Sequence, residues 1–445
     1  MVHCDDILRV ARERNVDIIG LSGLITPSLE EMTHVAAEMQ RLNYQIPLMI
    51  GGATTSKAHT AVKIQPAYDN NTVVYVPDAS RSVSVASQLL GDNKKAFGED
   101  IAAEYGLVRE RVTSRQKTSR RLSYPQALST AMPIEWHGYT PPTPSFEGTR
   151  EFSDYPLDEL LAFIDWTPFF ITWDLHGKFP AILDDAVVGE QARVLFADAQ
   201  AMLKQIIEEK WLSARAVIGF WRAHRINGDD IRVYDASGEP LADLHHLRQQ
   251  LHKRPGEYNL SLADFIAPEH QAKDYIGGFC VTTGHGVAER VKVFEEAHDD
   301  YNAIMLKALA DRLAEAFAEH MHQRVRTNLW GYAPDEALAN EDLIRERYQG
   351  IRPAPGYPAC PDHTEKATLF SLLGAEQACG VTLTESMAMY PTASVSGLYF
   401  SHPKARYFSV GKIGVDQLES LAERKNMPVE TLARWLAPNL DHASA

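Results

Sequence analysis

Three short apolar runs, separated by amphipathic segments, organise the N-terminal part of the chain. The runs are residues 16–21, 46–50 and 72–76, and their length and β-branched content are typical of buried strands. Ser28 followed by Glu31 forms a capping box where a helical pattern begins. The predicted helices are residues 28–42, 59–65 and 80–90. Strand, helix and strand at this spacing predict right-handed crossovers and a parallel α/β sheet of the Rossmann or flavodoxin-like type.

The rest of the chain has a mixed pattern. Asn227-Gly228 lies between apolar segments at residues 215–221 and 230–234, which predicts a β-hairpin. The other predicted elements are strands at residues 275–281 and 404–410 and helices at residues 299–326, 415–424 and 428–436. We therefore expect a large α+β domain built on a twisted antiparallel sheet.

Between the two patterns, residues 98–126 are rich in charge and lose apolar periodicity, which is typical of an interdomain linker. The predicted organisation is an N-terminal α/β domain at residues 1–98, a linker at 99–115 and the α+β domain at 116–445.

Composition excludes several classes of protein. No apolar run approaches the roughly 20 residues that cross a bilayer, so no membrane role is expected. The first residues lack the basic start and apolar core of a secretory signal, which predicts a cytoplasmic protein. The four cysteines show no CxxC spacing and are expected to be reduced thiols. A formal net charge of -15 argues against a nucleic-acid partner.

Small residues follow each predicted parallel strand. They include Ser22, Gly51, Gly52 and Ala79. Ligands of open parallel sheets lie at the carboxyl ends of the strands, where glycine permits close backbone approach. The alternative is that these are ordinary turns after buried strands.

A proline-rich loop at residues 350–360 holds Arg352 among three prolines, which push Arg352, Ala354 and Tyr357 toward extended conformations. Its guanidinium can donate two parallel hydrogen bonds to a carboxylate, so the loop suits a small anionic ligand. The alternative is a surface connector with a solvated arginine.

Three other residues are candidates for chemistry. Asp165 is crowded by aromatic residues, with Thr167-Pro168 expected to break the helix after it, and a carboxylate in such surroundings needs a partner. Glu315 lies between two alanines on the predicted long helix, and its spacing alone indicates a structural role. Tyr407, in the predicted strand 404–410, is typical of a core tyrosine.

Neither a metal site nor a phosphate loop is expected. His245-His246 and the pair His320 and His322 have spacings that point the side chains apart on a helix, and no cysteine or acidic partner recurs at zinc spacing. The chain contains neither GxxxxGK[ST] nor GxGxxG.

Residues 350–366 resemble the signature of the activation domain of cobalamin-dependent methionine synthase. Similar segments occur at residues 165–170, 308–319 and 394–403, and the N-terminal part resembles the cobalamin domain of the same family at residues 21–28 and 51–61. The resemblance runs through nearly the whole chain.

The resemblance implies two ligand sites. The residues that it assigns to S-adenosylmethionine are Asp165, Glu315, Arg352, Ala354, Tyr407 and Phe408. Those that it assigns to cobalamin are Ser22, Thr26, Gly51, Gly52 and Ala79. It implies reductive reactivation: the methyl group of S-adenosylmethionine passes to reduced cobalamin, giving methylcobalamin, within methionine biosynthesis from homocysteine and 5-methyltetrahydrofolate. The protein's task is then to orient the methyl group, without a catalytic acid or base.

The sequence also departs from the family pattern. The DxHxxG motif, whose histidine binds cobalt, is absent, and so is the strand before it, which makes the expected α/β sheet incomplete. The homocysteine module with its zinc and the folate module are absent as well. The resemblance implies two kinds of partner, a flavodoxin or related flavoprotein reductant and the remaining methionine synthase modules. The alternatives are a stand-alone S-adenosylmethionine-binding regulatory module and a corrinoid carrier.

Overall fold

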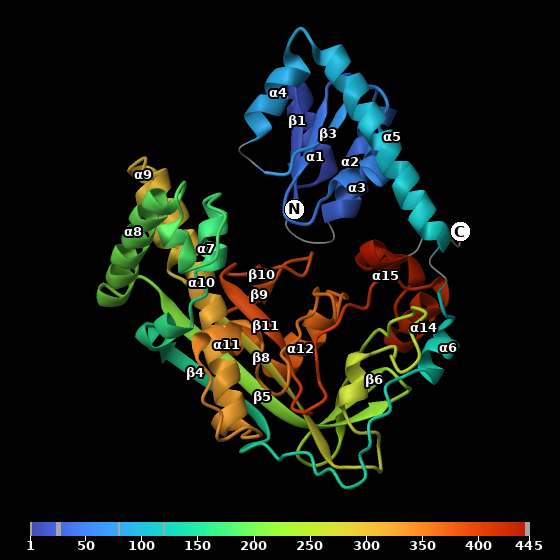
Figure 1. Cartoon of the computed structure of the whole chain (residues 1–445), viewed down its shortest axis with the longest axis vertical. Helices are drawn as coiled ribbons and strands as arrows, with labels where there is room; N and C mark the ends of the chain where they lie inside the picture. Colours follow the sequence, from blue (N-terminus) through green and yellow to red (C-terminus); the bar gives the residue numbers. More distant parts are fainter. Residues whose placement is uncertain (1, 24–27, 79–80, 119–120, 441–445) are drawn as a thin grey trace. The chain divides into compact units, whose positions relative to one another are not determined.

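The computed structural model describes residues 2–23, 28–78, 81–118 and 121–440, with the backbone alone for 112–118. The chain divides into two compact units (Figure 1). The first is Met1–Gln126, Gln250–Gly256 and Lys412–Ala445, and the second is Ala127–Gln249 and Glu257–Gly411.

A three-stranded parallel sheet forms the centre of the first unit. Its strand order is β1-β2-β3, and Ile19 pairs with Leu48, which in turn pairs with Val73. The elements of this part are α1 (Cys4–Glu13), β1 (Ile19–Ser22), α2 (Ser28–Arg41), β2 (Leu48–Gly51), α3 (Lys57–His59), β3 (Val73–Tyr75), α4 (Ser82–Leu90) and α5 (Lys94–Thr118). The predicted parallel sheet is confirmed, with shorter strands than expected. The helix predicted at 59–65 is a π-turn followed by a 3-10 turn.

The charged segment predicted as a linker is largely the helix α5. Tyr105 of α5 is buried, and its hydroxyl accepts a hydrogen bond from the backbone N–H of Tyr75 in β3 at 2.8 Å. Arg109 donates to the carbonyl of Ala61 at 3.1 Å. Tyr105 is the one buried residue among residues 94–111, which is why the sequence of α5 shows little helical periodicity.

A six-stranded antiparallel sheet organises the second unit, in the order β11-β8-β5-β6-β7 with β4 also paired to β5. Its strands are β4 (Gly148–Tyr155), β5 (Ser213–Ile226), β6 (Asp230–Tyr234), β7 (Pro240–His245), β8 (Asp274–His285) and β11 (Ser394–Tyr399), and a separate pair is β9 (Thr382–Leu383) and β10 (Met389–Tyr390). The predicted hairpin is confirmed, because Ile226 pairs with Asp230 across Asn227-Gly228.

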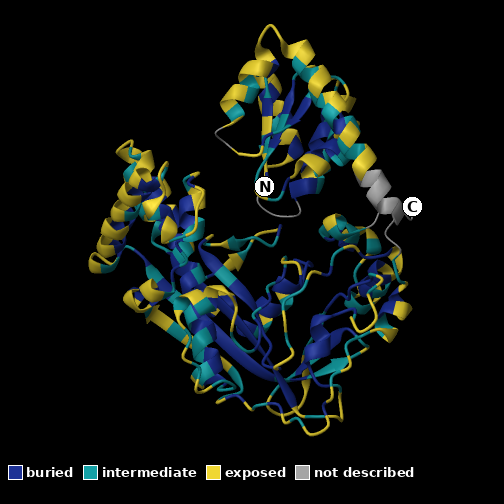
Figure 2. Ribbon diagram, in the orientation of Figure 1, coloured by how far each residue is buried: buried dark blue, intermediate teal, exposed yellow. Residues whose placement is uncertain are grey.

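Helices of the second unit pack on both faces of this sheet, and the buried residues form one core on each face (Figure 2). The helices from α6 onward are α6 (Tyr124–Ser129), α7 (Thr167–Thr172), α8 (Gly189–Glu208), α9 (Val287–Glu296), α10 (Asp300–Arg324), α11 (Asn340–Ile344), α12 (Glu365–Leu373), α13 (Ala375–Cys379), α14 (Val415–Lys425) and α15 (Val429–Trp435). The long helix α10 contacts β8 and β11. The last two helices, which belong to the first unit, confirm the predicted C-terminal pair.

Two local predictions are wrong. Residues 404–410 form no strand, because β11 occupies the edge of β8 and the segment instead lies along the 350–360 loop, where Val410 N–H donates to the carbonyl of Pro358 at 2.8 Å. Thr167-Pro168 starts the helix α7 rather than ending one, since proline is well tolerated in the first turn.

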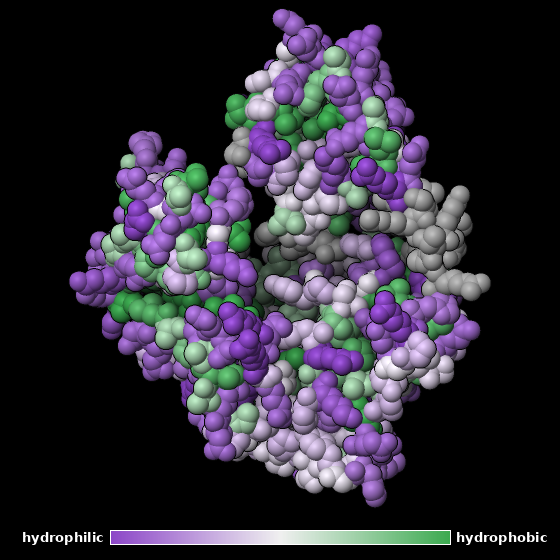
Figure 3. Space-filling view, in the orientation of Figure 1, coloured by the Kyte–Doolittle hydropathy of each residue, from purple (hydrophilic) through white to green (hydrophobic). Residues whose placement is uncertain are grey.

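Polar side chains dominate the visible face of the protein, with apolar ones scattered among them (Figure 3). No helix in the described ranges is both long and apolar enough to span a bilayer.

Candidate functional site

The loop that begins at Gly350 is fixed along β11. Ile351 and Phe400 exchange two backbone hydrogen bonds at 3.0 Å, and Leu398 N–H donates to the carbonyl of Pro353 at 2.8 Å. Gly350 has φ +81, and a Cβ there would meet the carbonyl oxygen of Phe400 at 2.6 Å, so the close approach requires glycine. The loop therefore extends the sheet instead of hanging in solvent.

A type II turn follows at Ala354-Pro355-Gly356-Tyr357. Tyr357 N–H donates to the carbonyl of Ala354 at 3.1 Å, proline is second, and Gly356 in third position has φ +96. Gly356 N–H in turn donates to the carbonyl of Cys360 at 2.7 Å. Proline and glycine in these positions reduce the freedom of the unfolded loop, so the turn is ordered in advance of any ligand.

Arg352 lies at the start of this turn with its guanidinium partly buried. Its Nη2 donates to Glu319 Oε2 at 3.0 Å, and its backbone N–H donates to the hydroxyl of Tyr407 at 3.0 Å. Its Nε is buried and has no hydrogen-bond partner among the described residues. Tyr407 and Phe408 are half-buried beside the loop. A guanidinium with a free buried nitrogen is suited to receive an anion.

Charge on the neighbouring residues sets the ionisation of this site. Burial lowers the pKa of Arg352. Its neighbours Glu319, Tyr407, Tyr348 and Glu315 raise the pKa by more than burial lowers it, so the net shift is upward. Burial raises the pKa of Tyr407, although Arg352 opposes the shift. At neutral pH the site therefore holds a fixed cation beside neutral phenols.

Of the other two predicted residues of this site, Glu315 lies on a helix and Asp165 lies in the loop just before α7. Glu315, on α10, is near enough to Arg352 to raise the pKa of its guanidinium. Asp165 accepts a hydrogen bond from Thr167 N–H at 3.0 Å at the start of α7, and α7 contacts α10. The predicted need of Asp165 for a partner is thus met by a backbone N–H donor. The structure brings Arg352, Ala354, Tyr407 and Phe408 together, with Glu315 in electrostatic range.

Sequence analysis did not single out Glu319, Arg326 and Glu336, although Glu319 and Arg326 lie seven residues apart on one helical face. The histidines at 320 and 322 face different surroundings. His320 makes a 2.7 Å hydrogen bond with the hydroxyl of Tyr155, whereas His322 is buried and stacked on Tyr399. In the described part of the chain, no three His, Cys, Asp or Glu side chains are grouped as a metal site requires.

The carboxyl ends of the parallel strands form the second candidate site. Ser22 ends β1 and pairs with Gly51 at the end of β2. Gly52 has φ +106, and a Cβ there would lie 2.2 Å from the carbonyl oxygen of Gly23. Close packing of the two loops therefore requires Gly52 before any ligand is considered. Thr26 and Ala79, also predicted for this site, lie outside the described residues.

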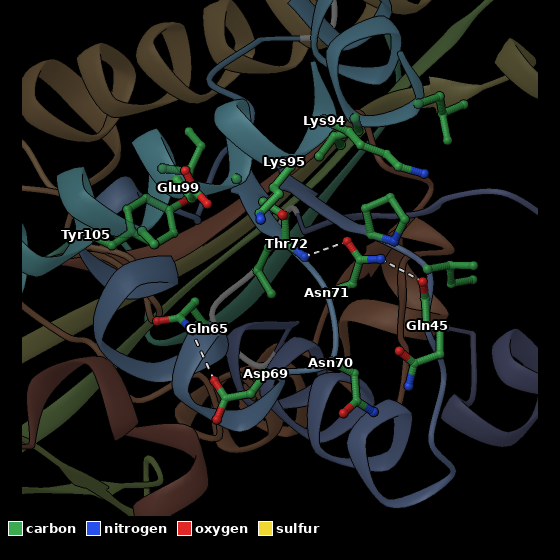
Figure 4. Close-up of a pocket in the computed structure, with 18 of the residues that line it drawn as sticks. Gln45, Gln65, Asp69, Asn70, Asn71, Thr72, Lys94, Lys95, Glu99 and Tyr105 are labelled. Carbon is green, nitrogen blue, oxygen red and sulfur yellow. Dashed lines mark hydrogen bonds between the residues drawn. The ribbon is translucent and has the colours of Figure 1, made fainter. Parts of the chain in front are cut away.

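A cavity of about 630 Å³ lies in the parallel-sheet region of the first unit, away from the carboxyl ends of its strands (Figure 4). Asn71 donates to the carbonyl of Gln45 at 2.6 Å on its wall, and Thr72 and Lys94 also line it. Thr72 immediately precedes β3, so the cavity lies at the amino ends of the strands. Because parallel sheets place ligands at the opposite ends, we assign it no role in the predicted site.

Comparison with known proteins identifies both parts. The family model described as "Vitamin B12 dependent methionine synthase, activation domain" matches residues 156–426, and that of the B12 binding domain matches residues 1–70. A crystal structure of the MetH reactivation domain bound to AdoHcy is similar, with a TM-score of 0.71 and 52% identity, over 73% of this chain and 100% of that chain. The first match covers more than half of the chain, so this protein belongs to the vitamin B12-dependent methionine synthase activation-domain family.

Proposed function

We propose that this chain binds S-adenosylmethionine at the loop 350–358 and presents its methyl group to reduced cobalamin, the reactivation step of methionine synthase. The observation that carries the proposal is the geometry of Arg352, whose guanidinium is held by Glu319 while its buried Nε has no partner among the described residues. The similar MetH reactivation domain was solved with AdoHcy, which has the same carboxylate and ammonium as the proposed ligand.

The charges of the ligand match those of the site. Its carboxylate would pair with Arg352, and its ammonium and sulfonium would be stabilised by Glu315 and Asp165. Tyr407 and Phe408 offer half-buried aromatic surface. The ordered turn at Ala354 supports this fit, because a preset loop loses little entropy on binding.

The carboxyl ends of β1 and β2 would hold cobalamin, with Ser22, Gly51, Gly52, Thr26 and Ala79 against its nucleotide tail. Glycine at 52 keeps the two loops packed against each other at the carboxyl ends of β1 and β2, where a large ligand of a parallel sheet would lie. Cobalamin, when bound, would supply the nucleophile that accepts the methyl group. The chain's own residues bind and orient the methyl donor and exclude water. We propose domains at 1–98 and 116–445, a flavodoxin-like reductant, and the other methionine synthase modules as partners.

Titration of the purified chain with S-adenosylmethionine tests the first site. Replacing Arg352 with alanine removes the charged donor, so we expect a loss of roughly 2 kcal/mol or more of binding free energy. Arg345→Ala is the matched control, because Arg345 is 60% exposed and its ion pair with Glu341 is long, at 3.9 Å. Isothermal calorimetry gives both affinities. Equal binding by wild type and Arg352→Ala would refute the proposed site.

The second site is tested by Gly52→Ala. Positive φ alone costs roughly 1–3 kcal/mol for alanine, before the clash with Gly23 is counted. We therefore expect a lower unfolding free energy of the parallel-sheet part and loss of hydroxocobalamin retention through desalting, read from absorbance. Gly20→Ala is the control, because nothing lies within 4 Å of a Cβ at Gly20. Retention by Gly52→Ala equal to that of Gly20→Ala would contradict the proposal.

A further inference from the structure

Four side chains of alternating charge form a row that ends at Arg352: Glu336, Arg326, Glu319 and Arg352. Nε and Nη2 of Arg326 both donate to Glu336, at 2.9 and 2.8 Å. Nη1 of Arg326 lies 3.5 Å from Oε1 of Glu319, whose Oε2 accepts from Arg352 at 3.0 Å. Arg326 is 0% exposed, Glu336 7% and Glu319 11%, so water screens these charges weakly.

The two inner residues of the row, Glu319 and Arg326, are held by the fold. Glu319 lies on α10, and Arg326 lies in the π-turn η7 (Val325–Leu329) that continues it. The guanidinium of Arg326 also lies over the ring of Tyr348, 4.3 Å from its centroid. A forked pair to Glu336 and a ring contact leave Arg326 little rotational freedom. One oxygen of Glu319 therefore faces the fixed Arg326 guanidinium as an ion pair without a hydrogen bond, and the other accepts from Arg352.

Arg352 is the open end of the row. One of its nitrogens is used by Glu319, while its buried Nε makes no hydrogen bond to any described residue. A forked bond to a carboxylate needs a guanidinium plane of fixed orientation. An arginine side chain otherwise loses rotamer freedom when its ligand binds. The two guanidiniums and two carboxylates cancel in charge, so the row adds no net repulsion against an anionic ligand.

We propose that Glu319 is a positioning residue: it holds Arg352 in the orientation that receives the ligand's carboxylate, and Glu336 holds Glu319 through Arg326. The inference rests on the proposed function, in which Arg352 binds the carboxylate of S-adenosylmethionine. It adds that this orientation exists before the ligand arrives, and that it is set by residues that do not touch the ligand.

The test compares S-adenosylhomocysteine with its carboxamide, which differs from it at the carboxylate. Wild type is expected to prefer the carboxylate. Glu319→Gln keeps the side-chain volume and removes the charge, and is expected to weaken S-adenosylhomocysteine binding about tenfold while leaving carboxamide binding nearly unchanged. Glu296→Gln, at an exposed glutamate of α9, is the control and is expected to bind both ligands as wild type does. Calorimetry gives the affinities, and thermal melting reports folding.

The outcomes separate this inference from the function on which it rests. If wild type prefers the carboxylate and Glu319→Gln keeps that preference, the positioning role is overturned and the proposed function stands. If wild type binds neither compound, or binds both equally, the proposed function fails and this inference falls with it. If Glu319→Gln does not fold, Glu336→Gln takes its place. A loss of affinity for S-adenosylhomocysteine of less than tenfold, with unchanged affinity for the carboxamide, supports the positioning role. A wild-type preference for the carboxylate overturns it.

Discussion

Replacing Arg248 with methionine is expected to lower the unfolding free energy of the second unit by about 3–5 kcal/mol, because it leaves two buried carboxylates without their cation. Arg248 Nη2 donates to Asp229 at 2.6 Å and to Asp264 at 2.7 Å, and Nη1 donates to Asp264 at 2.8 Å and to the carbonyl of Asn259 at 2.6 Å. All three charged side chains are at most 1% exposed. Burial lowers the pKa of Arg248, but Asp264 and Asp229 more than reverse that shift.

Arg232→Met is the matched control for this measurement. Arg232 makes a forked pair with Asp243 at 2.7 Å for both bonds, but the two side chains are 38% and 29% exposed. Exposed pairs contribute about 0–1 kcal/mol, so the control should change stability little. Urea denaturation followed by tryptophan fluorescence gives both values. Equal losses for the two variants would mean that burial does not set the contribution of the Arg248 network.

Local sequence signals predicted the elements whose form depends on near neighbours. The predicted helix start at Ser28 matches the first residue of α2, and the turn Asn227-Gly228 joins β5 to β6, where both residues have positive φ. Apolar periodicity predicted α10 over nearly its full length. These features depend on contacts within a few residues, which the sequence displays directly.

Tertiary competition explains the strand that did not form. Residues 404–410 have strand-like composition, yet β11 already pairs with β8 through Ser394 to Tyr399. The segment follows the 350–360 loop instead, where the hydroxyl of Tyr407 accepts from Arg352 N–H. Propensity alone cannot show which of two segments pairs with a strand, because pairing is decided by the whole sheet.

The candidate site was predictable where family signature and loop chemistry coincide, and hidden where it depends on long-range contacts. The prolines around Arg352 mark a rigid loop, and the resemblance to the family, which the comparisons confirm, pointed to this loop. Glu319 and Glu336 meet Arg326 and Arg352 only after α10 and the loops after it are folded. No short spacing in the sequence records that arrangement.

Acid is expected to destabilise the second unit between pH 6.5 and about 4, because buried histidines that are neutral in the folded protein take up protons when the chain unfolds. Burial, followed by Lys366, lowers the pKa of His363 from 6.5 to about 4, and burial, followed by Lys404, does the same for His402. Burial holds the pKa of His322 well below 6.5. In this range these histidines bind more protons in the unfolded chain than in the folded one, so their contribution to the unfolding free energy falls as pH falls, by on the order of 3 kcal/mol for each of His363 and His402. Burial raises the pKa of Asp274 to about 7, which offsets part of this loss.

His402→Asn isolates one contribution. His402 Nδ1 accepts from Lys404 N–H at 3.1 Å, and asparagine can keep an acceptor there without titrating. The variant should be less stable at neutral pH, since contacts with Trp136 and Tyr139 are lost. Its unfolding free energy should fall less steeply with acid, because unfolding of the variant takes up nearly one proton fewer than unfolding of wild type. His176→Asn, at a side chain 75% exposed, is the matched control. Urea denaturation at a series of pH values measures the slope. A wild-type slope in His402→Asn would show that the pKa of His402 does not change on unfolding, because only a histidine whose pKa is lowered by the fold takes up a proton when the chain unfolds.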